Sequence, residues 1–343
     1  MTRILSIDGG GFRGVIPAHI LQALQREAGG TAFTSLFDVF AGTSTGAILC
    51  AGLTAPRERG SRAPRHDIAR ILDIYRQEGP VIFRKKSLHE LNADLADLAS
   101  VNLLELVTPG AGVNDLRKLL NLVNRLRQPL HDLDVLMDRL EVHFSGLRMG
   151  DALRRLMLAT YDLNSRQLRV IDSSLDPNRS MPRMVGASAA APGFFAPAAI
   201  GNDMLLTDGG MGLSNPALYA VARLVGEGVA LQDITVVSLG TGAAAPATGT
   251  RDWNKWERMG PLHWLLSQEY LTTLWDGSGE LVDYTLSALL GPRYHRLQVD
   301  MDSAMIRLDD GSGDYYRTLV GVADAWITAR RASIQAAARA VRR

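Results

Sequence analysis

Short apolar runs alternate with glycine-rich turns through the first part of the chain. Residues 3–7 (RILSI) are apolar and β-leaning and run into an aspartate and three glycines, which predicts a strand. Apolar positions then recur on one face of a predicted helix over residues 15–28, which Gly29 and Gly30 end. Residues 36–40 (LFDVF) predict a second strand, which leads through a turn into a second helix ending near Gly52. This order of elements is typical of a parallel sheet with right-handed crossovers.

The middle of the chain has a different pattern. Residues 55–66 are rich in Arg, Pro and Gly, which predicts a surface loop, and residues 67–78 predict a helix. Leucines then recur at helical spacing, with basic residues opposed to them, and residues 108–112 (TPGAG) divide this stretch in two. We interpret residues 87–130 as a helical hairpin inserted into the main domain. Two roles stay open for it: packing its leucines on the core, or acting as a lid, a membrane-contact element or an oligomer contact.

The second half of the chain returns to strands and then to helices. Residues 168–171, 204–206 and 234–239 predict three more strands, and residues 253–343 are largely helical in pattern. The last basic residues are interpreted as a solvated end: Arg330, Arg331, Arg339, Arg342 and Arg343. The pattern therefore predicts one α/β domain over residues 1–325, with the insert inside it, and a basic C-terminal helix or tail over residues 326–343.

Composition narrows the class of protein. Apolar residues make up 46% of the 343 residues and charged residues 21%, which is near the average for folded soluble domains and excludes wholesale disorder. The net charge is +1, so no global charge steers the chain toward nucleic acid. A single cysteine, Cys50, excludes a disulfide framework and a cysteine-based zinc site, and it is expected in the core.

No segment has the pattern of a secretory signal or a membrane span. Asp8 interrupts the N-terminal apolar run before an apolar region of sufficient length can form. Residues 39–56, 184–202 and 234–250 are uncharged, but they contain several glycines and polar residues. A spanning helix must satisfy its backbone internally, so these stretches are expected to be buried strands and turns. We therefore expect a soluble, cytoplasmic protein.

A glycine-rich loop is the first candidate for chemistry. Residues 8–14 (DGGGFRG) lie between a predicted strand and a predicted helix. Glycines there let backbone amides point at an anion, and the helix N-terminus adds a favourable dipole. The spacing of Gly9, Gly11 and Gly14 also matches the dinucleotide-binding fingerprint. That interpretation needs an acidic residue at the end of the second strand, whereas Asp38 lies inside it, so a nucleotide-binding module is the weaker alternative.

A second glycine-rich turn carries a candidate nucleophile. Residues 42–46 (GTSTG) lie between an apolar strand and an apolar helix. A G-x-S-x-G sequence in this context predicts a sharp turn that exposes the hydroxyl group of its serine, Ser44, above the sheet. Gly42 and Gly46 are required because larger side chains would collide in so tight a turn.

A nucleophilic serine needs a base, and the histidines do not supply one. None of the seven lies in a glycine-rich turn after a strand: His19, His66, His89, His131, His143, His263 and His295. His131 and His143 fall in predicted helical stretches and are expected at the surface. Asp208 is better placed, because it ends an apolar strand and enters a turn at Gly209 and Gly210. A direct Ser–Asp pair is a workable activated nucleophile.

The attack on a carbonyl group also needs hydrogen-bond donors for the oxyanion. The backbone amides of Gly10 and Gly11 are the candidates. Two roles stay open for Arg13: it supplies charge or holds the loop, or it is structural and pairs with a carboxylate.

These motifs, in this order, resemble those of a known family. Residues 8–14, 42–46 and 208–210 (DGG) resemble the motifs of the patatin-like phospholipases. Further segments resemble the same family: residues 187–195 (ASAAAPGFF), 215–217 (NPA) and 238–242 (SLGTG). The resemblance implies a three-layer α/β/α sandwich with a mostly parallel central sheet, distinct from the α/β-hydrolase fold. It also implies a lipid acyl hydrolase that uses a Ser–Asp dyad and needs no metal or other cofactor.

The resemblance assigns roles by position. Ser44 is the implied nucleophile, Asp208 the base, and Gly10, Gly11 and Arg13 form or support the oxyanion hole. The remaining motif glycines are Gly9, Gly14, Gly42, Gly46, Gly209 and Gly210. The implied reaction is hydrolysis of fatty acyl esters of phospholipids or other membrane lipids through an acyl-enzyme, by a protein that contacts the membrane surface transiently. The same acyl-serine would also serve an acyltransferase or a thioesterase.

Two features depart from the family's pattern. The family often has Asn-Asn-Pro after the aspartate, where this chain has SNP (residues 214–216), and Ser214 can still make a local turn hydrogen bond. Residues 87–130 have no counterpart. Some bacterial members that resemble this chain are defence effectors activated by a cyclic nucleotide. No residue here marks a nucleotide site, so a small-molecule activator stays open, as does a homo-oligomer.

Overall fold

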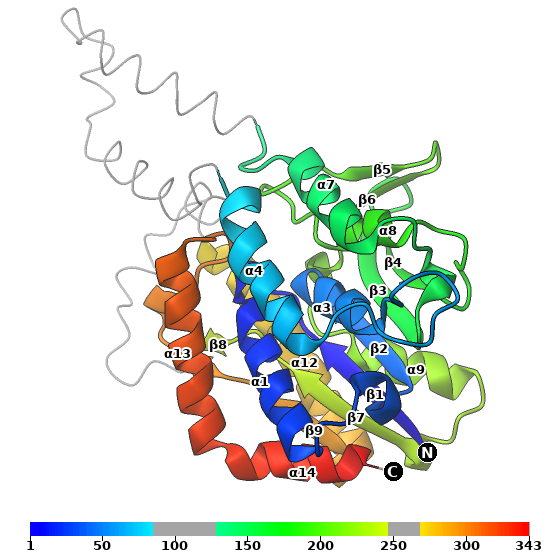
Figure 1. Cartoon of the computed structure of the whole chain (residues 1–343), viewed down its shortest axis with the longest axis vertical. Helices are drawn as coiled ribbons and strands as arrows, with labels where there is room; N and C mark the ends of the chain where they lie inside the picture. The colour runs from blue at the N-terminus through cyan, green and yellow to red at the C-terminus, as the bar shows by residue number, and fades with distance from the viewer. Residues whose placement is uncertain (85–127, 246–267, 343) are drawn as a thin grey trace, which may run out of the picture.

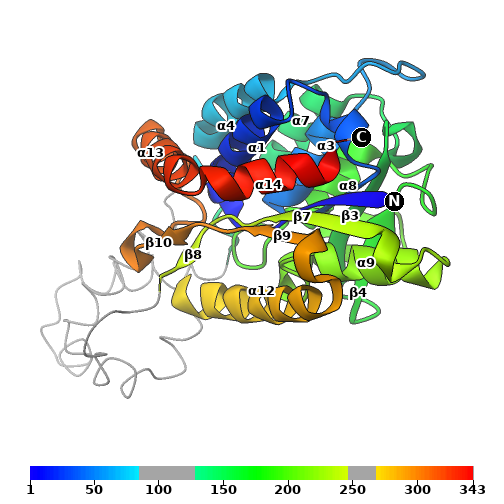
Figure 2. The same cartoon turned by 90° about the horizontal axis from the view of Figure 1, so that it is seen from below.

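The computed structural model describes residues 1–84, 128–245 and 268–342. In this part of the chain a central sheet separates two layers of helices (Figure 1). Figure 2 shows α1 (Val15–Glu27), α4 (Ile68–Ile82) and α14 (Arg331–Val341) on one face of the sheet, and α9 (Ala217–Gly226) and α12 (Gln268–Leu290) on the other. Further helices are α2 (Phe33–Leu36), α3 (Thr45–Thr54), α7 (Leu133–Phe144), α8 (Met181–Ser188) and α13 (Gly313–Ala329). The predicted three-layer α/β/α sandwich is confirmed.

The sheet has the strand order β5-β6-β3-β2-β1-β7-β9, with β4 also paired to β3. Neighbouring strands are parallel in the series β3 (Arg155–Asp162), β2 (Val39–Thr43), β1 (Thr2–Ile7), β7 (Ile234–Leu239) and β9 (Tyr294–Leu297). The antiparallel additions are β4 (Gln167–Asp172), β5 (Ala198–Ile200) and β6 (Met204–Asp208). A separate pair joins β8 (Ala243–Ala244) to β10 (Asp300–Met301). Because parallel strands end at the same edge, the loops after β1, β2 and β7 lie side by side, where ligands bind in open α/β sheets.

The alternation of side chains along β1 explains why both faces of the sheet are covered. Leu5 and Ile7 belong to a core cluster that includes the apolar face of α1, whereas Ile4 belongs to a second cluster with α9. All three side chains are fully buried, and so is Cys50, as predicted.

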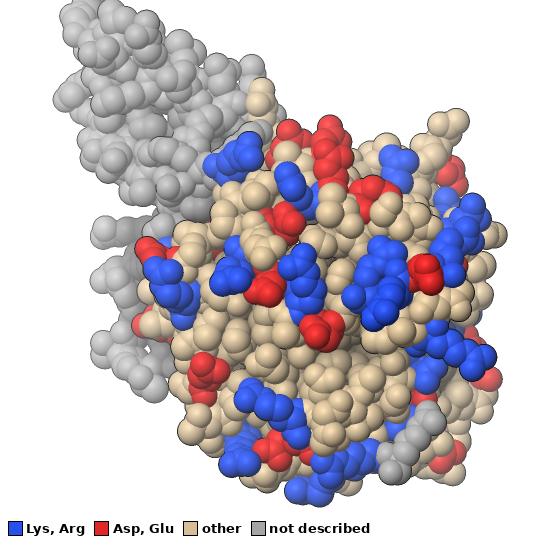
Figure 3. Space-filling model, in the orientation of Figure 1, with Lys and Arg blue, Asp and Glu red and all other residues tan. Residues whose placement is uncertain are grey.

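The face that shows α1, α4 and α13 carries charged side chains of both signs. Basic and acidic side chains are interspersed there (Figure 3), in line with the net charge of +1. Among the described helices, none combines the length and apolar character needed to cross a membrane.

Several elements differ from the sequence-based expectation. The second strand starts at Val39, not at residue 36, because the preceding residues form α2 and Asp38 pairs with Arg3 (Nη2–Oδ1 3.1 Å). The pattern does not predict β3, whose Leu, Met and Ala residues favour helices. It also misses β9, which lies in the region expected to be helical. The insert predicted over residues 87–130 lies almost wholly outside the described residues.

Candidate active site

The turn from β2 to α3 has the tight geometry expected of a nucleophile elbow. The backbone of Ser44 has φ 56° and ψ −121°, a conformation that residues other than glycine rarely adopt. A Cβ on Gly42 would lie 2.3 Å from the carbonyl oxygen of Gly46, and a Cβ on Gly46 would lie 2.1 Å from that of Ile7. These backbone contacts explain why both flanking positions are glycine, and they hold Ser44 in its strained conformation.

Ser188 supports this turn from the end of α8. Its hydroxyl group accepts a hydrogen bond from the Ser44 amide (3.1 Å) and donates one to the carbonyl of Ala159 on β3 (2.6 Å). Ser188 therefore fixes the elbow to the neighbouring strand. Sequence reasoning placed it in the family-like segment 187–195 but gave it no role.

The sheet topology explains how Asp208 reaches Ser44. β4 pairs with one side of β3, so β2 and β6 must share the other side. Thr43, the last residue of β2, lies opposite Ala159, and Asp208, the last residue of β6, lies opposite the next residue, Thr160. The two strands run in opposite directions, so their ends meet and bring Ser44 and Asp208 together.

The Asp208 side chain is fully buried. Its Oδ1 accepts a hydrogen bond from the Gly210 amide (2.7 Å), whereas its Oδ2 has no directed hydrogen bond within the described chain. Burial raises the Asp208 pKa to about 6, although the nearby Ser44 hydroxyl and the Gly210 amide lower it in part. The carboxyl group is thus more basic than an exposed aspartate and faces the Ser44 hydroxyl.

The loop after β1 packs so closely that two of its glycines cannot be replaced freely. A Cβ on Gly10 would lie 2.0 Å from Thr241 Oγ1, which itself donates to the Gly9 carbonyl (2.7 Å). Gly11 has φ +60°, and a Cβ there would lie 2.0 Å from the Leu308 carbonyl oxygen. The amides of Gly10 and Gly11 donate to no described residue. Both amides are therefore available to donate to a bound group, and Gly11 lines the same pocket as Ser44.

Arg13 holds this loop through backbone carbonyls. Its Nη1 donates to Gly242 (2.6 Å) and its Nε to Gly10 (3.3 Å). The side chain is buried, and that burial lowers its pKa from the ordinary value. These contacts support the loop-holding role left open for Arg13.

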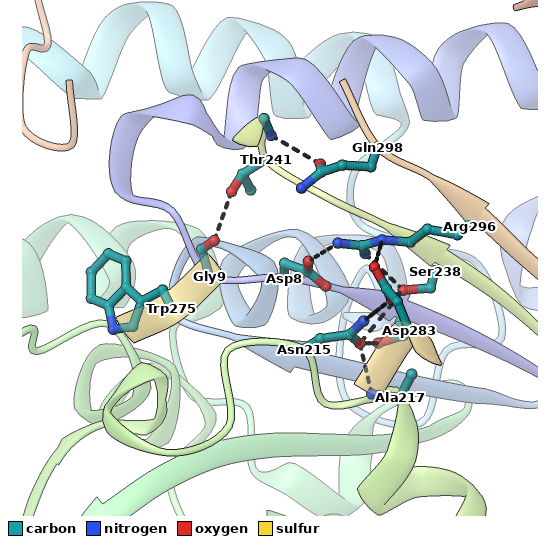
Figure 4. Close-up of polar contacts among 12 residues, drawn as sticks. Asp8, Gly9, Asn215, Ala217, Ser238, Thr241, Trp275, Asp283, Arg296 and Gln298 are labelled. Carbon is teal, nitrogen blue, oxygen red and sulfur yellow. Dashed lines mark hydrogen bonds and ion pairs between the residues drawn. The ribbon is translucent and has the colours of Figure 1, made fainter. Parts of the chain in front are cut away.

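A buried polar network lies behind the loop and links it to the chain after Asp208 (Figure 4). Arg296 on β9 contacts Asp8 (Nη2–Oδ2 2.6 Å), Asp283 on α12 (Nε–Oδ2 2.8 Å) and Ser238 (Nη1–Oγ 2.9 Å). Asn215 donates from Nδ2 to Asp283 Oδ1 (3.1 Å), and the preceding carbonyl of residue 214 accepts from the Gly9 amide (3.1 Å). The SNP segment thus keeps its asparagine in the network despite the departure from the family's pattern.

Arg296 and Asp283 are functional candidates that sequence reasoning missed. Both lie in the C-terminal region, whose pattern is largely helical and contains none of the motifs that mark the rest of the site. Burial raises the pKa of Asp8 to about 6, and the Arg296 guanidinium opposes that rise. The network therefore keeps the Asp8 carboxylate, whose burial costs desolvation free energy, next to the glycine loop and pairs it with the Arg296 guanidinium.

An apolar pocket opens from Ser44 and Gly11 into the space between α4 and α7. Its empty volume is about 820 Å³, part of which is open to solvent. Apart from the site itself, its apolar walls include Phe12, Ile48, Ile74, Tyr75, Ile82, Phe83, Leu136, Leu140, Phe194, Phe195, Trp275 and Leu308. Glu78, Arg139 and His143 add charged or polar groups. The pocket suits a hydrocarbon chain.

Two histidines expected at the surface are buried instead. His143 is 8% exposed, and its Nε2 lies 3.1 Å from Glu78 Oε1 at the pocket. His131 is 2% exposed and lies in the loop before α7. The expectation was wrong because the partners of both side chains are distant in sequence.

The described residues bring no group of three or more His, Cys, Asp or Glu side chains together in an arrangement that could hold a metal ion.

Comparison with known proteins agrees with these motifs. The sequence profile of the patatin-like phospholipases matches residues 5–221. The chain belongs to the patatin-like phospholipase family. It is therefore a lipid acyl hydrolase, and the resemblance inferred from the motifs is confirmed.

Several curated relatives come from potato. Patatin group M-3 of Solanum tuberosum is 25% identical over 361 aligned positions, which cover 94% of this chain and 83% of the relative. Patatin-2-Kuras 1 of the same species is 26% identical, with 94% and 86% coverage. The patatin match therefore extends beyond the motifs to most of the chain.

Solved structures give weaker matches. VipD from Legionella pneumophila is 14% identical with a TM-score of 0.35, and the match covers 94% of this chain and 67% of VipD. ExoU from Pseudomonas aeruginosa, in complex with SpcU, is 16% identical with a TM-score of 0.30, and the match covers 96% of this chain and 61% of ExoU.

Proposed function

We propose that Ser44 and Asp208 form a catalytic dyad that hydrolyses fatty acyl esters of phospholipids at a membrane surface. The observation that carries this proposal is the meeting of the ends of β2 and β6 on one side of β3. It places a strained serine beside a buried carboxyl group with a raised pKa. The pocket that starts at Ser44 then receives the acyl chain.

The mechanism uses one proton acceptor for both halves of the reaction. Asp208 takes the proton of the Ser44 hydroxyl as Oγ attacks the ester carbonyl carbon. The Gly10 and Gly11 amides donate to the oxyanion, and the departing alcohol receives the proton from Asp208. A water molecule then gives a proton to Asp208 and attacks the acyl-enzyme, and the fatty acid leaves as Ser44 regains its proton.

The reaction is expected to lose activity as the pH falls through about 6. Asp208 must be ionised to accept a proton, and its pKa is about 6. The value of kcat/KM should be constant above about pH 7 and fall about tenfold per pH unit below pH 6. Initial rates on a soluble short-chain ester between pH 4.5 and 8.5 measure this profile.

Asp8 has a similar pKa, so it needs its own control. Asp8→Asn removes that titration and can still accept a hydrogen bond from Arg296. We expect this variant still to lose activity below about pH 6, which is the acidic limb of the pH profile. Its disappearance would assign the limb to Asp8 and not to Asp208.

The direct test combines covalent labelling with product analysis. A fluorophosphonate should label wild-type protein at Ser44, located by mass spectrometry, and the same protein should release fatty acid from mixed phospholipid vesicles. Absence of label on folded protein would contradict the role of Ser44. Label without fatty acid release would contradict unaided hydrolysis, and competing alcohols and thiols would then identify another acceptor for the acyl group.

A further inference from the structure

His131 and Asp309 form a buried pair directly behind the wall of the pocket. The distance from His131 Nε2 to Asp309 Oδ2 is 2.9 Å, and both side chains have 0% exposure. The aromatic rings of Phe83 and Phe195 lie 5.1 Å and 5.7 Å from the imidazole, measured between centroids. Both rings also line the pocket. The pair therefore sits in an apolar setting next to the substrate space.

Asp309 follows the residue on which the glycine loop rests. The Leu308 carbonyl accepts a hydrogen bond from the Phe12 amide (2.8 Å), and it is the atom that a Cβ on Gly11 would strike. The direction of the Gly11 amide thus depends on where Leu308 lies. A shift of the Leu308 carbonyl would shift the proposed oxyanion donors with it.

The chain is held on both sides of Leu308. Tyr315 donates its hydroxyl proton toward the carbonyls of Met305 (2.8 Å) and Arg307 (3.0 Å), which fixes the chain before Leu308. The side chain of Asp309 fixes the chain after Leu308 through His131.

His131 is itself anchored on another segment that lines the pocket. Its backbone amide donates to the Phe194 carbonyl (2.7 Å), and the Leu130 amide donates to the Gly193 carbonyl (3.0 Å). The imidazole therefore spans from the segment at residues 193–195 to the segment at residues 308–309. It connects two walls that are far apart in the sequence.

Stability alone does not require a polar pair here. Replacing a buried polar or charged pair with apolar residues of similar volume is often neutral or stabilising, whereas removing one partner is costly. A directed hydrogen bond differs from an apolar contact because it fixes one relative position of its two ends. At this place, the position that it fixes is that of the Leu308 carbonyl.

We propose that His131 is a positioning residue for the oxyanion hole, which it sets through Asp309, Leu308 and Gly11. This inference rests on the proposed function, because it assumes that the Gly10 and Gly11 amides bind the oxyanion. Loss of the pair lets the loop move, and a misplacement of about 1 Å in an active site can cost about 10²-fold in rate. The effect falls on kcat, since the pocket walls that bind the acyl chain remain.

The test compares His131→Leu, His131→Gln and the double variant His131→Leu/Asp309→Leu with the wild type. For each, kcat and KM are measured on a soluble short-chain ester, together with the rate of Ser44 labelling by a fluorophosphonate and the melting temperature. We expect His131→Leu to lose about 10- to 10²-fold in kcat and in labelling rate with little change in KM. Glutamine can still donate to Asp309, so His131→Gln should restore most of the rate.

The double variant separates positioning from stability. It buries no unpaired carboxylate, so it should melt at a higher temperature than His131→Leu, and it should fold even if His131→Leu does not. We expect its kcat to stay low. Recovery of kcat together with stability would overturn the proposal, as would a wild-type kcat in His131→Leu.

Two comparisons keep this result distinct from a failure of the proposed function. His19→Leu changes a half-buried histidine on α1 away from the pocket, and it should leave kcat unchanged. Wild-type labelling at Ser44 establishes the dyad independently. If the wild type is labelled and active and the His131 variants keep the wild-type kcat, only the positioning role of His131 is rejected.

Discussion

Asp208→Asn is expected to lower turnover by about 10²–10⁴ while leaving the fold intact. The amide is isosteric with the carboxyl group, and its oxygen can still accept the 2.7 Å hydrogen bond from the Gly210 amide. It cannot accept the Ser44 proton. Ser44→Ala removes the nucleophile and should reduce turnover at least as far. Fatty acid release from phospholipid vesicles measures both variants, with circular dichroism to show that they are folded.

Turnover retained in folded Asp208→Asn would contradict the dyad. His143 would then be the first alternative base to test, since it lines the same pocket as Ser44. The matched variant is His143→Gln, which keeps a polar group beside Glu78. Under the proposed mechanism, His143→Gln should lose activity below about pH 6 as the wild type does, because Asp208 remains the group that titrates.

The same Asp208 substitution is expected to stabilise the protein at pH 8. The Asp208 pKa is about 6 in the folded state and 3.8 in an exposed reference. The folded state therefore binds the proton more tightly, so stability falls as pH rises from about 4 to about 6 and stays lower above that. A difference of about two pKa units corresponds to about 3 kcal/mol. A neutral asparagine avoids this cost, so Asp208→Asn should melt at a higher temperature than the wild type at pH 8. The difference between the two melting temperatures should disappear toward pH 4.

Gly11→Ala is the second substitution with a large expected effect. The new Cβ would meet the Leu308 carbonyl oxygen at 2.0 Å in a backbone region with φ +60°. Backbone atoms on both sides prevent an easy adjustment, so the loop must move and the Gly11 amide must turn away. Loss of one oxyanion donor typically costs about 10²–10³ in rate. Rates on a soluble ester and the rate of fluorophosphonate labelling should fall together.

Gly30→Ala is the matched control for backbone strain. Gly30 has φ +76°, and a Cβ there would meet no atom within 4 Å. Alanine carries a similar left-handed penalty of about 1–2 kcal/mol at either position. We expect Gly30→Ala to lose stability and keep its activity. Equal rates in Gly11→Ala and Gly30→Ala would contradict the proposal that the glycine loop binds the oxyanion.

The sequence predicts most of what is local in this site. Gly42 and Gly46 mark the elbow because a G-x-S-x-G sequence between an apolar strand and an apolar helix is typical of such a turn. Asp208 is predictable because a strand ends there in a glycine turn. The loop at residues 8–14 follows the same logic. Residue type and local pattern reveal these features, although the contacts that require glycine include distant ones, between Gly46 and Ile7 and between Gly11 and Leu308.

The missed features depend on distant partners. β3 becomes a strand despite its helix-favouring residues because β2 and β4 flank it. Arg296 gains its role only when β9 is placed beside β7, next to Asp8. His131 is buried by a partner 178 residues later. No periodicity in the sequence reports such contacts, so a polar residue in a helical stretch is assigned to the surface by default.

The head-to-head meeting of β2 and β6 also bears on how the protein acquires activity during folding. Ser44 and Asp208 are 164 residues apart in the sequence, and they meet only after β3 has paired with both strands. Contacts of such long sequence separation form late because the closure entropy of the intervening chain opposes them. After dilution from denaturant, helical circular dichroism should therefore return before esterase activity. The delay between the two signals would time the closure of β6 onto β3.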